Sequence, residues 1–168
     1  MTVDIDKIEY RFVSVEEMIK LLDKIEFMEH NKFYNRKEVE KHLDDDSVEY
    51  CIQFYGKVPL SISVMKFDSF SDNDATCLEL QSVVPGYCLY FMDHLITDPK
   101  VMRNKDIWFC VDHSNPLCGR LLKFYSVFKT RYDLKEVDII RNGKMFTFFY
   151  SYPCSDEERE LNHFMSFI

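Results

Sequence analysis

The stretch that decides the fold is IWFCVDHSNP, residues 107–116. Its first five residues are all apolar, which is typical of a short strand buried on both faces at the centre of a sheet. Asn115-Pro116 then opens a helix that continues to about Phe128, because proline is favoured near the first turn of a helix. A buried strand followed at once by a helix predicts a sheet with helices packed against it.

Towards the C-terminus, the sequence predicts a β-hairpin and a short tail. Residues 137–141 and 144–150 are strand-like and flank Asn142-Gly143, the dipeptide that most strongly favours a two-residue hairpin turn. Beyond the hairpin, Ser155 is followed three residues later by Glu158, which is a capping box. We therefore expect a terminal helix over residues 155–168, with its apolar face docked on its own domain or on a partner.

Towards the N-terminus, capping residues and changes of hydrophobic period mark the elements. Ser14 and Asn35 are each followed by a glutamate three residues on, so each should begin a helix, the second ending at about Leu43. Pro85-Gly86 stops a strand, and Asp98-Pro99 closes the helix after it. The predicted strands cover residues 8–13, 49–54, 60–67 and 76–84, and the third predicted helix covers residues 87–96.

The complete order is therefore β-α-α-β-β-β-α-β-α-β-β, plus the short C-terminal helix. This order is neither a strict βαβ alternation nor an all-β pattern, and it predicts an α+β fold: a mixed twisted sheet with helices on both faces. At 168 residues the chain has the usual size of one domain. We expect a single domain over residues 1–168, with its core in residues 8–150.

Charge and composition exclude several classes of protein. The net charge is −8 and the densest charge run, residues 44–46, is acidic, so broad binding to nucleic acid or to an anionic membrane is not expected. No apolar run approaches the roughly 18 residues of a membrane helix. The six cysteines lack zinc-site spacing and are expected to be reduced, several of them inside buried strands. These features predict a cytoplasmic location.

The order of elements over residues 8–150 resembles the Gcn5-related N-acetyltransferase (GNAT) fold. Residues 111–115, leading into the helix that ends near Phe128, are similar to the second motif of that family. The resemblance implies that the pantetheine arm of acetyl-CoA pairs with the fourth strand, here residues 77–84. It implies cofactor-binding roles for five residues: Gln81, Val83, Val84, Gly86 and Asn115.

Three residues are candidates for the chemistry of acetyl transfer. Glu79 or His113 could accept the proton of an amine, and Tyr125 could protonate the departing thiolate. Each candidate also has a structural interpretation. Glu79 could be a solvent-facing strand residue, His113 a loop residue without a role in catalysis, and Tyr125 a packing residue among its apolar neighbours. Cys110 and Cys118 flank His113, so nucleophilic catalysis by a cysteine with this histidine is a further alternative. No third group that would activate such a pair can be named.

The stretch VPGYCLY, residues 84–90, departs from the family pattern. The GNAT family usually has an Arg or Gln followed by a glycine-rich turn, which directs backbone N–H groups at the cofactor pyrophosphate. Here the stretch contains one glycine and no arginine. Two hypotheses therefore stay open: an acetyl-CoA-dependent N-acetyltransferase, or a GNAT-like scaffold that no longer catalyses the reaction. The scaffold would be encoded by a phage and would bind a virion or host protein in the host cytoplasm or in the virion.

Overall fold

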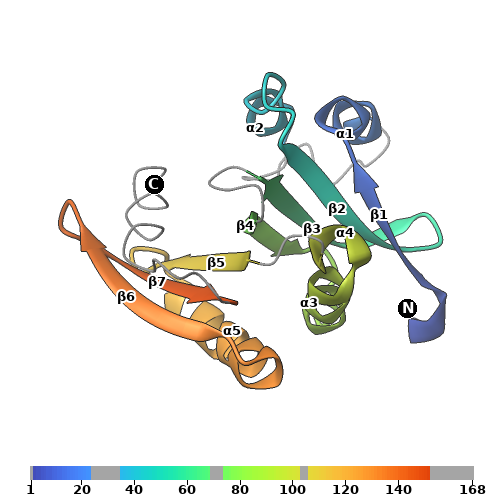
Figure 1. Ribbon diagram of the computed structural model, residues 1–168. Helices are drawn as coiled ribbons and strands as arrows, with labels where there is room; N and C mark the ends of the chain where they lie inside the picture. The colour runs from blue at the N-terminus through green and yellow to red at the C-terminus, as the bar shows by residue number, and fades with distance from the viewer. Residues whose placement is uncertain (1, 24–34, 69–73, 103–105, 152–168) are drawn as a thin grey trace. The chain divides into compact units, whose positions relative to one another are not determined.

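The computed structural model describes residues 2–23, 35–68, 74–102 and 106–151 (Figure 1). Hydrogen-bonded strands follow the order β1-β2-β3-β4-β5-β7-β6 in one seven-stranded mixed sheet. The chain divides into two compact units, one formed by Met1–Lys66 with Leu78–Leu95 and the other by Phe67–Cys77 with Ile96–Ile168. Strand β4 (Asp74–Ser82) contributes residues to both units.

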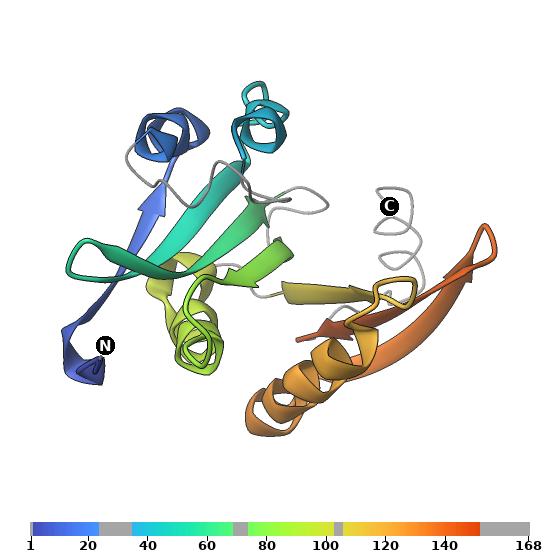
Figure 2. The same cartoon turned by 180° about the vertical axis from the view of Figure 1, so that it is seen from behind.

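The first unit is built on three antiparallel strands with helices on both faces. Strand β2 (Val48–Tyr55) pairs with β1 (Ile8–Val13) on one side and with β3 (Val58–Phe67) on the other. Helices α1 (Val15–Leu22) and α2 (Arg36–Glu40) cover one face, and α3 (Cys88–Thr97) lies against the other face (Figures 1 and 2).

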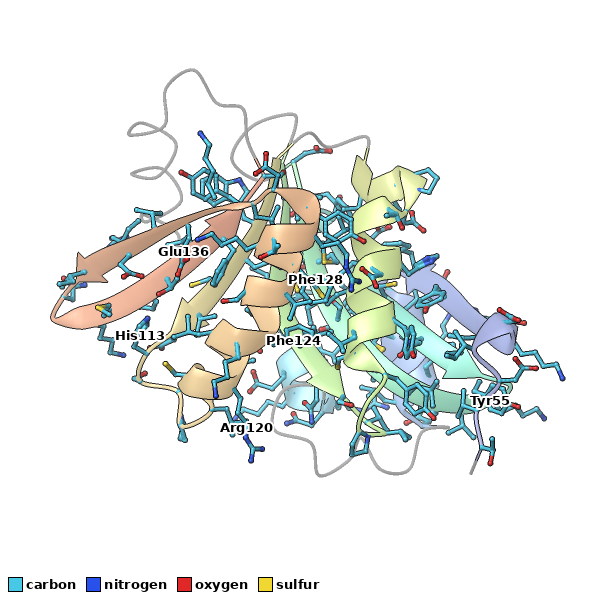
Figure 3. All side chains as sticks on the ribbon, turned by 90° about the horizontal axis from the view of Figure 1, so that it is seen from below. Tyr55, His113, Arg120, Phe124, Phe128 and Glu136 are labelled. Atoms are coloured by element: carbon cyan, nitrogen blue, oxygen red, sulfur yellow. The ribbon has the colours of Figure 1, made fainter. Side chains whose placement is uncertain are left out.

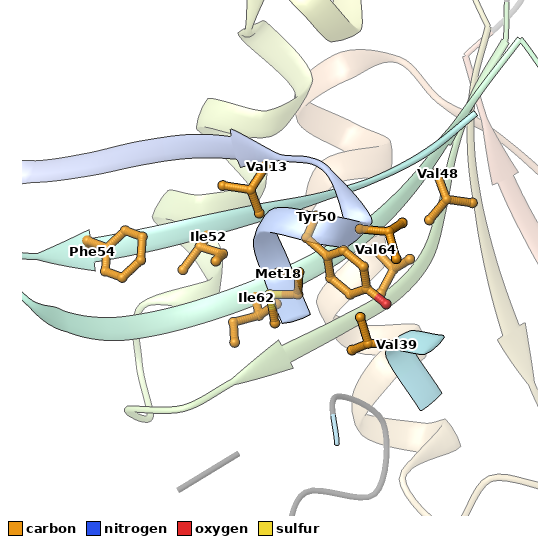
Figure 4. Close-up of a cluster of buried hydrophobic side chains, with 10 residues drawn as sticks. Val13, Met18, Val39, Val48, Tyr50, Ile52, Phe54, Ile62 and Val64 are labelled. Carbon is orange, nitrogen blue, oxygen red and sulfur yellow. The ribbon is translucent and has the colours of Figure 1, made fainter. Parts of the chain in front are cut away.

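A cluster of buried apolar side chains fixes α1 and α2 on this sheet (Figure 4). Met18 and Val39 project from the two helices and are fully buried against β-branched and aromatic residues of the strands. Along each strand, successive side chains point to opposite faces of the sheet, as its pleat requires. The strand side chains in this cluster are Val13, Val48, Tyr50, Ile52, Phe54, Ile62 and Val64.

Both helices begin at the predicted capping residues. Ser14 Oγ accepts a hydrogen bond from the N–H of Glu17 at 3.2 Å, and Asn35 Oδ1 accepts one from the N–H of Glu38 at 3.1 Å. These bonds satisfy backbone donors that have no partner within a helix. In the sequence, Ile25 and Met28 continue the helical spacing of Met18, Leu21 and Leu22, but this continuation lies outside the described residues.

The second unit contains a three-stranded part of the sheet with one long helix. Strand β7 (Lys144–Tyr150) pairs antiparallel with both β5 (Asp106–Asp112) and β6 (Lys135–Arg141). Helix α5 (Cys118–Tyr132) packs Tyr125 and Phe128 against one face of these strands. Trp108, Phe148 and Tyr150 form a separate buried cluster on the opposite face.

Local sequence signals place most element boundaries within two residues of their observed positions. The hairpin at Asn142-Gly143 is confirmed, with φ of 50° and 74° as a turn of this kind requires. Several details differ from the prediction. Helix α2 ends at Glu40 rather than near Leu43, a short helix α4 (Pro99–Met102) follows Asp98, and β4 ends at Ser82.

Helix α5 begins two residues after Pro116 because Asn115 forms a turn before it. Asn115 and Pro116 therefore precede the helix and do not form its first turn. The expected tail helix, residues 155–168, lies outside the described residues, as does Cys154. The other five cysteines are free thiols, with Cys51 and Cys77 buried. Within the described part of the chain, no helix is long and apolar enough to cross a membrane.

Candidate functional site

Strand β4 ends in a β-bulge. The N–H groups of Val83 and Val84 both donate to the carbonyl oxygen of Leu60 on β3, at 2.8 and 2.9 Å. Two residues facing one partner is the pattern of a bulge, which bends a strand out of its ladder. Ser82 Oγ donates to the carbonyl oxygen of Val84 at 2.7 Å and fixes the bend. The N–H groups of two predicted cofactor-binding residues are thus used within the fold.

The bulge leads directly into the N-terminus of α3. Gly86 has a φ of +98°, which L-amino acids rarely adopt, and a Cβ added there would meet no atom within 4 Å. Among the described residues, none accepts a hydrogen bond from the N–H groups of Cys88, Leu89 or Tyr90. Free donors and the positive end of the helix dipole favour an anionic ligand at such a terminus. Residues 83–90 contain no lysine or arginine, so within this segment only backbone groups could bind an anion.

Side chains from β1 and β2 hold the start of α3 in place. The buried Gln53 donates from Nε2 to the hydroxyl of Tyr10 and to the carbonyl oxygen of Tyr87, both at 3.3 Å. The Tyr10 ring stacks on His94 with a centroid separation of 3.6 Å and on Phe91 at 6.1 Å. The bulge and the helix terminus are therefore supported by packed elements of the first unit.

Cys88 lies in the first turn of α3 with its sulfur 3.6 Å from Ser61 Oγ. Burial raises the pKa of this thiol, and hydrogen bonds with Ser61 and Ser82 only partly oppose that effect. A raised pKa keeps the thiol protonated and makes it a poor nucleophile. Cys88 is therefore a packing residue rather than a reactive group.

Gln81 and Glu79 lie along β4 before the bulge. Gln81 is half-buried, and its Oε1 atom is buried without a hydrogen-bond partner among the described residues. An unsatisfied buried acceptor is costly in a folded protein and is suited to a donor from a ligand. Glu79 is exposed. This exposure agrees with the interpretation of Glu79 as a solvent-facing strand residue.

The parallel ladder between β4 and β5 is short. It joins Asp74–Cys77 to Asp106–Phe109, with Cys77 opposite Phe109 as its last pair. Strand β4 continues beyond that pair to Ser82.

The loop after β5 is organised by two short polar side chains. Asp112 Oδ1 accepts from the N–H and the hydroxyl of Ser114 at 2.8 and 2.7 Å. These bonds hold the pKa of the Asp112 carboxyl below its ordinary value, with smaller contributions from Lys144 and His113. Asn115 Oδ1 accepts from the N–H of Leu117 at 2.9 Å. The oxygen of the Asn115 amide is thus committed to the turn, and its NH₂ group is the part that can meet a ligand.

His113 is fixed between this loop and β7 (Figure 3). Its backbone N–H donates to the carbonyl oxygen of Met145 at 3.0 Å. Its ring atom Nε2 is 2.7 Å from Thr147 Oγ1, which donates to Asp138 Oδ1 at 2.6 Å. Neither Thr147 nor Asp138 was a candidate from the sequence.

Tyr125 is 5% exposed and lies in the aromatic core under α5. Its ring stacks on Phe109 at 5.4 Å and contacts Phe149 and Phe124 at 5.6 and 5.3 Å. This environment matches the packing interpretation of the residue. Cys110 packs on the opposite face, against the cluster that contains Trp108, while Cys118 opens α5.

Known proteins match this chain by structure and not by sequence. No family model matches, and no curated protein of similar sequence matches. The structure of Paenibacillus lautus diaminobutyrate acetyltransferase EctA, in complex with its substrate and coenzyme A, superimposes with a TM-score of 0.61 at 8% identity. The match covers 92% of this chain and 99% of the other. The fold is that of the GNAT acetyltransferases.

Two further solved structures support this GNAT-like fold. A protein assigned to the GNAT acetyltransferases from Desulfovibrio desulfuricans matches with a TM-score of 0.57 at 9% identity, covering 85% of this chain and 97% of that one. An acetyltransferase from Thermus thermophilus matches with the same TM-score at 14% identity, covering 89% and 98%. At these identities the likeness establishes the fold.

Within this GNAT-like fold, six of the eight predicted site residues form two groups. Gln81, Val83, Val84 and Gly86 lie together at the end of β4 in the first unit. His113 and Asn115 share the loop after β5 in the second unit. The two-residue turn at 142–143 was the signal that could have placed Asp138 opposite Thr147, because it sets the register of the hairpin.

Proposed function

We propose that this protein is an N-acetyltransferase that transfers an acetyl group from acetyl-CoA to an amine. The observation that carries the proposal is the arrangement at the end of β4. A bulge is followed by Gly86 and then by helix N–H groups for which no described residue is an acceptor. A strand that leaves its ladder and delivers a helix N-terminus is a suitable site for a phosphate group. The GNAT-like fold supports the same proposal.

The residues at the end of β4 fit acetyl-CoA. The N–H groups of Cys88 to Tyr90 would hold the pyrophosphate, with Gly86 leaving the approach free of a side chain. The buried, unpartnered Oε1 of Gln81 would accept a hydrogen bond from an amide of the pantetheine arm. For Asn115, in the second unit, a hydrogen bond from the NH₂ group to the cofactor stays a prediction from the family resemblance.

The chemistry requires an acceptor for one proton. Bound acetyl-CoA supplies an activated thioester: the amine nitrogen bonds to the acetyl carbon, the C–S bond breaks, and the sulfur leaves as a thiolate. The proton lost by the amine passes to His113 or, as the second candidate, to Glu79. His113 is the better supported of the two because its ring bonds to Thr147, which in turn bonds to Asp138, whereas Glu79 is exposed.

A substrate whose reacting amine is neutral and whose second amino group carries a positive charge suits the acidity of the chain. The net charge of −8 attracts cationic small molecules over a distance. Among the structurally similar proteins, one is a diaminobutyrate acetyltransferase and another is a spermidine/spermine N-acetyltransferase from Vibrio cholerae. We therefore propose small aliphatic diamines and polyamines as the first substrates to test.

The direct test is release of free thiol from acetyl-CoA in the presence of diaminobutyrate, spermidine or a lysine peptide. We expect thiol release that depends on one of these amines, with an acetylated amine detected by mass spectrometry. Reactions without amine and without protein are the controls. Thiol release that never exceeds the controls with any member of the panel would contradict the proposed activity.

A second candidate function is a GNAT-like scaffold, encoded by a phage, that binds a virion or host protein. The observation that favours it is the first turn of α3, where Leu89 and Tyr90 are 45% and 42% exposed and the segment 83–90 contains no lysine or arginine. Affinity purification from host lysate or from virions tests this alternative. A stoichiometric partner that is lost on Tyr90→Ala would support the scaffold, and a monomer that captures nothing would count against it.

A further inference from the structure

Three polar side chains from different segments of the second unit form one hydrogen-bonded chain. Thr147 lies on the central strand β7, directly opposite Asp138 on β6. Its hydroxyl is 2.6 Å from Asp138 Oδ1 and 2.7 Å from His113 Nε2. Thr147 is 1% exposed, so its hydroxyl position is fixed by packing, whereas Asp138 is exposed at the outer strand of the sheet.

The number of available protons determines which group donates and which accepts in each of these hydrogen bonds. An ionised carboxylate can only accept, so the single hydroxyl proton of Thr147 is donated to Asp138. The short contact with His113 must then use a proton on Nε2, with the Thr147 oxygen as the acceptor. In the neutral imidazole the other nitrogen, Nδ1, therefore carries a lone pair. No described residue donates a hydrogen bond to it.

The backbone and the neighbouring charges support this orientation. The bond from the His113 N–H to the carbonyl oxygen of Met145 extends the contact between β5 and β7 by one residue. Asp112, the neighbouring carboxylate, is occupied by Ser114 and does not bond to the ring. A ring held at one nitrogen and at its own backbone presents its second nitrogen in one direction.

We propose that Thr147 and Asp138 are positioning residues that hold His113 in the Nε2–H tautomer, with Nδ1 as the proton acceptor for the amine. The inference rests on the proposed acetyl transfer. In that reaction the N–H bond of the amine breaks as its nitrogen bonds to the acetyl carbon, and the proton ends on Nδ1. The imidazolium that forms keeps its Nε2–H bond to Thr147, so the hydrogen bonds among His113, Thr147 and Asp138 do not rearrange during the step.

The tautomer can be measured without any assumption about activity. Two-bond nitrogen–proton correlation spectra of the ¹⁵N-labelled protein distinguish a protonated ring nitrogen from one with a lone pair, and His113→Asn assigns the signal by removing it. We expect a protonated Nε2 and an unprotonated Nδ1 in the wild-type protein. A wild-type protein with its proton on Nδ1 would overturn the proposal.

Variants of the two positioning residues make the test sharper. Asp138→Ala frees the Thr147 hydroxyl to donate to Nε2, so the ring proton should shift towards Nδ1. Asp138 is exposed, and this variant is expected to fold. Thr147→Ser should keep the wild-type tautomer, and Thr147→Val should lose the preference. An unchanged tautomer in both Asp138→Ala and Thr147→Val would show that the hydrogen bonds through Thr147 and Asp138 do not position the His113 ring.

Kinetics then link the tautomer to the reaction. We expect His113→Asn to lower kcat by about 100-fold, the lower range for general-base catalysis. Thr147→Val should lower kcat with little change in the KM for acetyl-CoA, and Thr147→Ser should restore it. Thr130→Val, which removes an exposed hydroxyl of α5, is the matched control. Equal kcat in the wild type and Thr147→Val would overturn the positioning role. A wild-type protein without activity would instead overturn the proposed function, and the spectra alone would then decide the tautomer.

Discussion

Burial separates the roles of residues that look equivalent in the sequence. His113 and Tyr125 belong to the same motif, and both were candidates for proton transfer. The structure places Tyr125 in an aromatic core and His113 in a polar chain with Thr147 and Asp138. The candidate His113 could be found from the sequence, but its contact with Thr147 depends on the pairing of β5 with β7. Pairing between strands about 35 residues apart leaves no local signal.

The first prediction at this scale concerns Tyr125. Tyr125→Ala should lower the free energy of unfolding by about 3–5 kcal/mol, since it removes a large buried ring. Tyr125→Phe keeps the ring and should cost no more than about 1.5 kcal/mol. Urea unfolding measures both values. Acetyl transfer should survive Tyr125→Phe, and a stable Tyr125→Phe protein without turnover would show that the phenol takes part in the chemistry.

A second prediction concerns Asp45, the central residue of the acidic run. Burial raises the pKa of its carboxyl, but hydrogen bonds from Lys66, at 2.8 Å, and from Ser47 outweigh that effect and hold the pKa below its ordinary value. A lowered pKa in the folded state stabilises the protein above the unfolded-state pKa of about 3.9, and the gain is lost as the pH falls through the folded-state value.

Asp45→Asn should therefore destabilise the protein at pH 7 by less than about 1 kcal/mol, because the Asp45 side chain is 35% exposed and solvent screens the pair. The difference from the wild type should shrink as the pH falls below about 4. Unfolding midpoints in urea at several pH values measure it. Asp46→Asn is the matched control, and an equal effect from both substitutions would contradict a specific role for Asp45.

At the scale of elements, local chemistry accounts for what the sequence predicts well. Ser14 and Asn35 cap their helices, and Asn142-Gly143 turns its hairpin, because each acts on neighbours within a few residues. The bulge at Val83 and Val84 could not be predicted in this way. Both residues are β-branched and suit a strand, and the bulge arises only because both donate to Leu60 on another strand.

Gly86 and Gly119 offer a matched test of the β4–α3 connection. Neither would bring a new Cβ within 4 Å of another atom, so an alanine acts through the backbone alone. Gly86→Ala should lower the free energy of unfolding by about 1–2 kcal/mol, because φ is +98° there. Gly119→Ala, within α5, should raise it by up to about 1 kcal/mol. Urea unfolding gives both values, and a loss of stability in Gly119→Ala equal to that in Gly86→Ala would contradict the assigned conformations.

At the scale of the whole molecule, the order of elements was enough to predict the α+β GNAT-like fold. The insertion of β7 between β5 and β6 follows from the hairpin and from the antiparallel pairing of β7 with β5. The function does not follow from the fold in the same way, because one fold supports many activities. The function depends on whether the backbone donors after Gly86 suffice for a pyrophosphate when residues 83–90 supply no lysine or arginine.

Titration of the protein with acetyl-CoA in a calorimeter tests this central claim most directly. We expect a saturable heat with one site per chain and a rise in the unfolding temperature, since a ligand that binds the folded state stabilises it. Pantetheine, which lacks the pyrophosphate, should bind more weakly and serves as the matched ligand. No heat and no thermal shift at millimolar acetyl-CoA would contradict the claim.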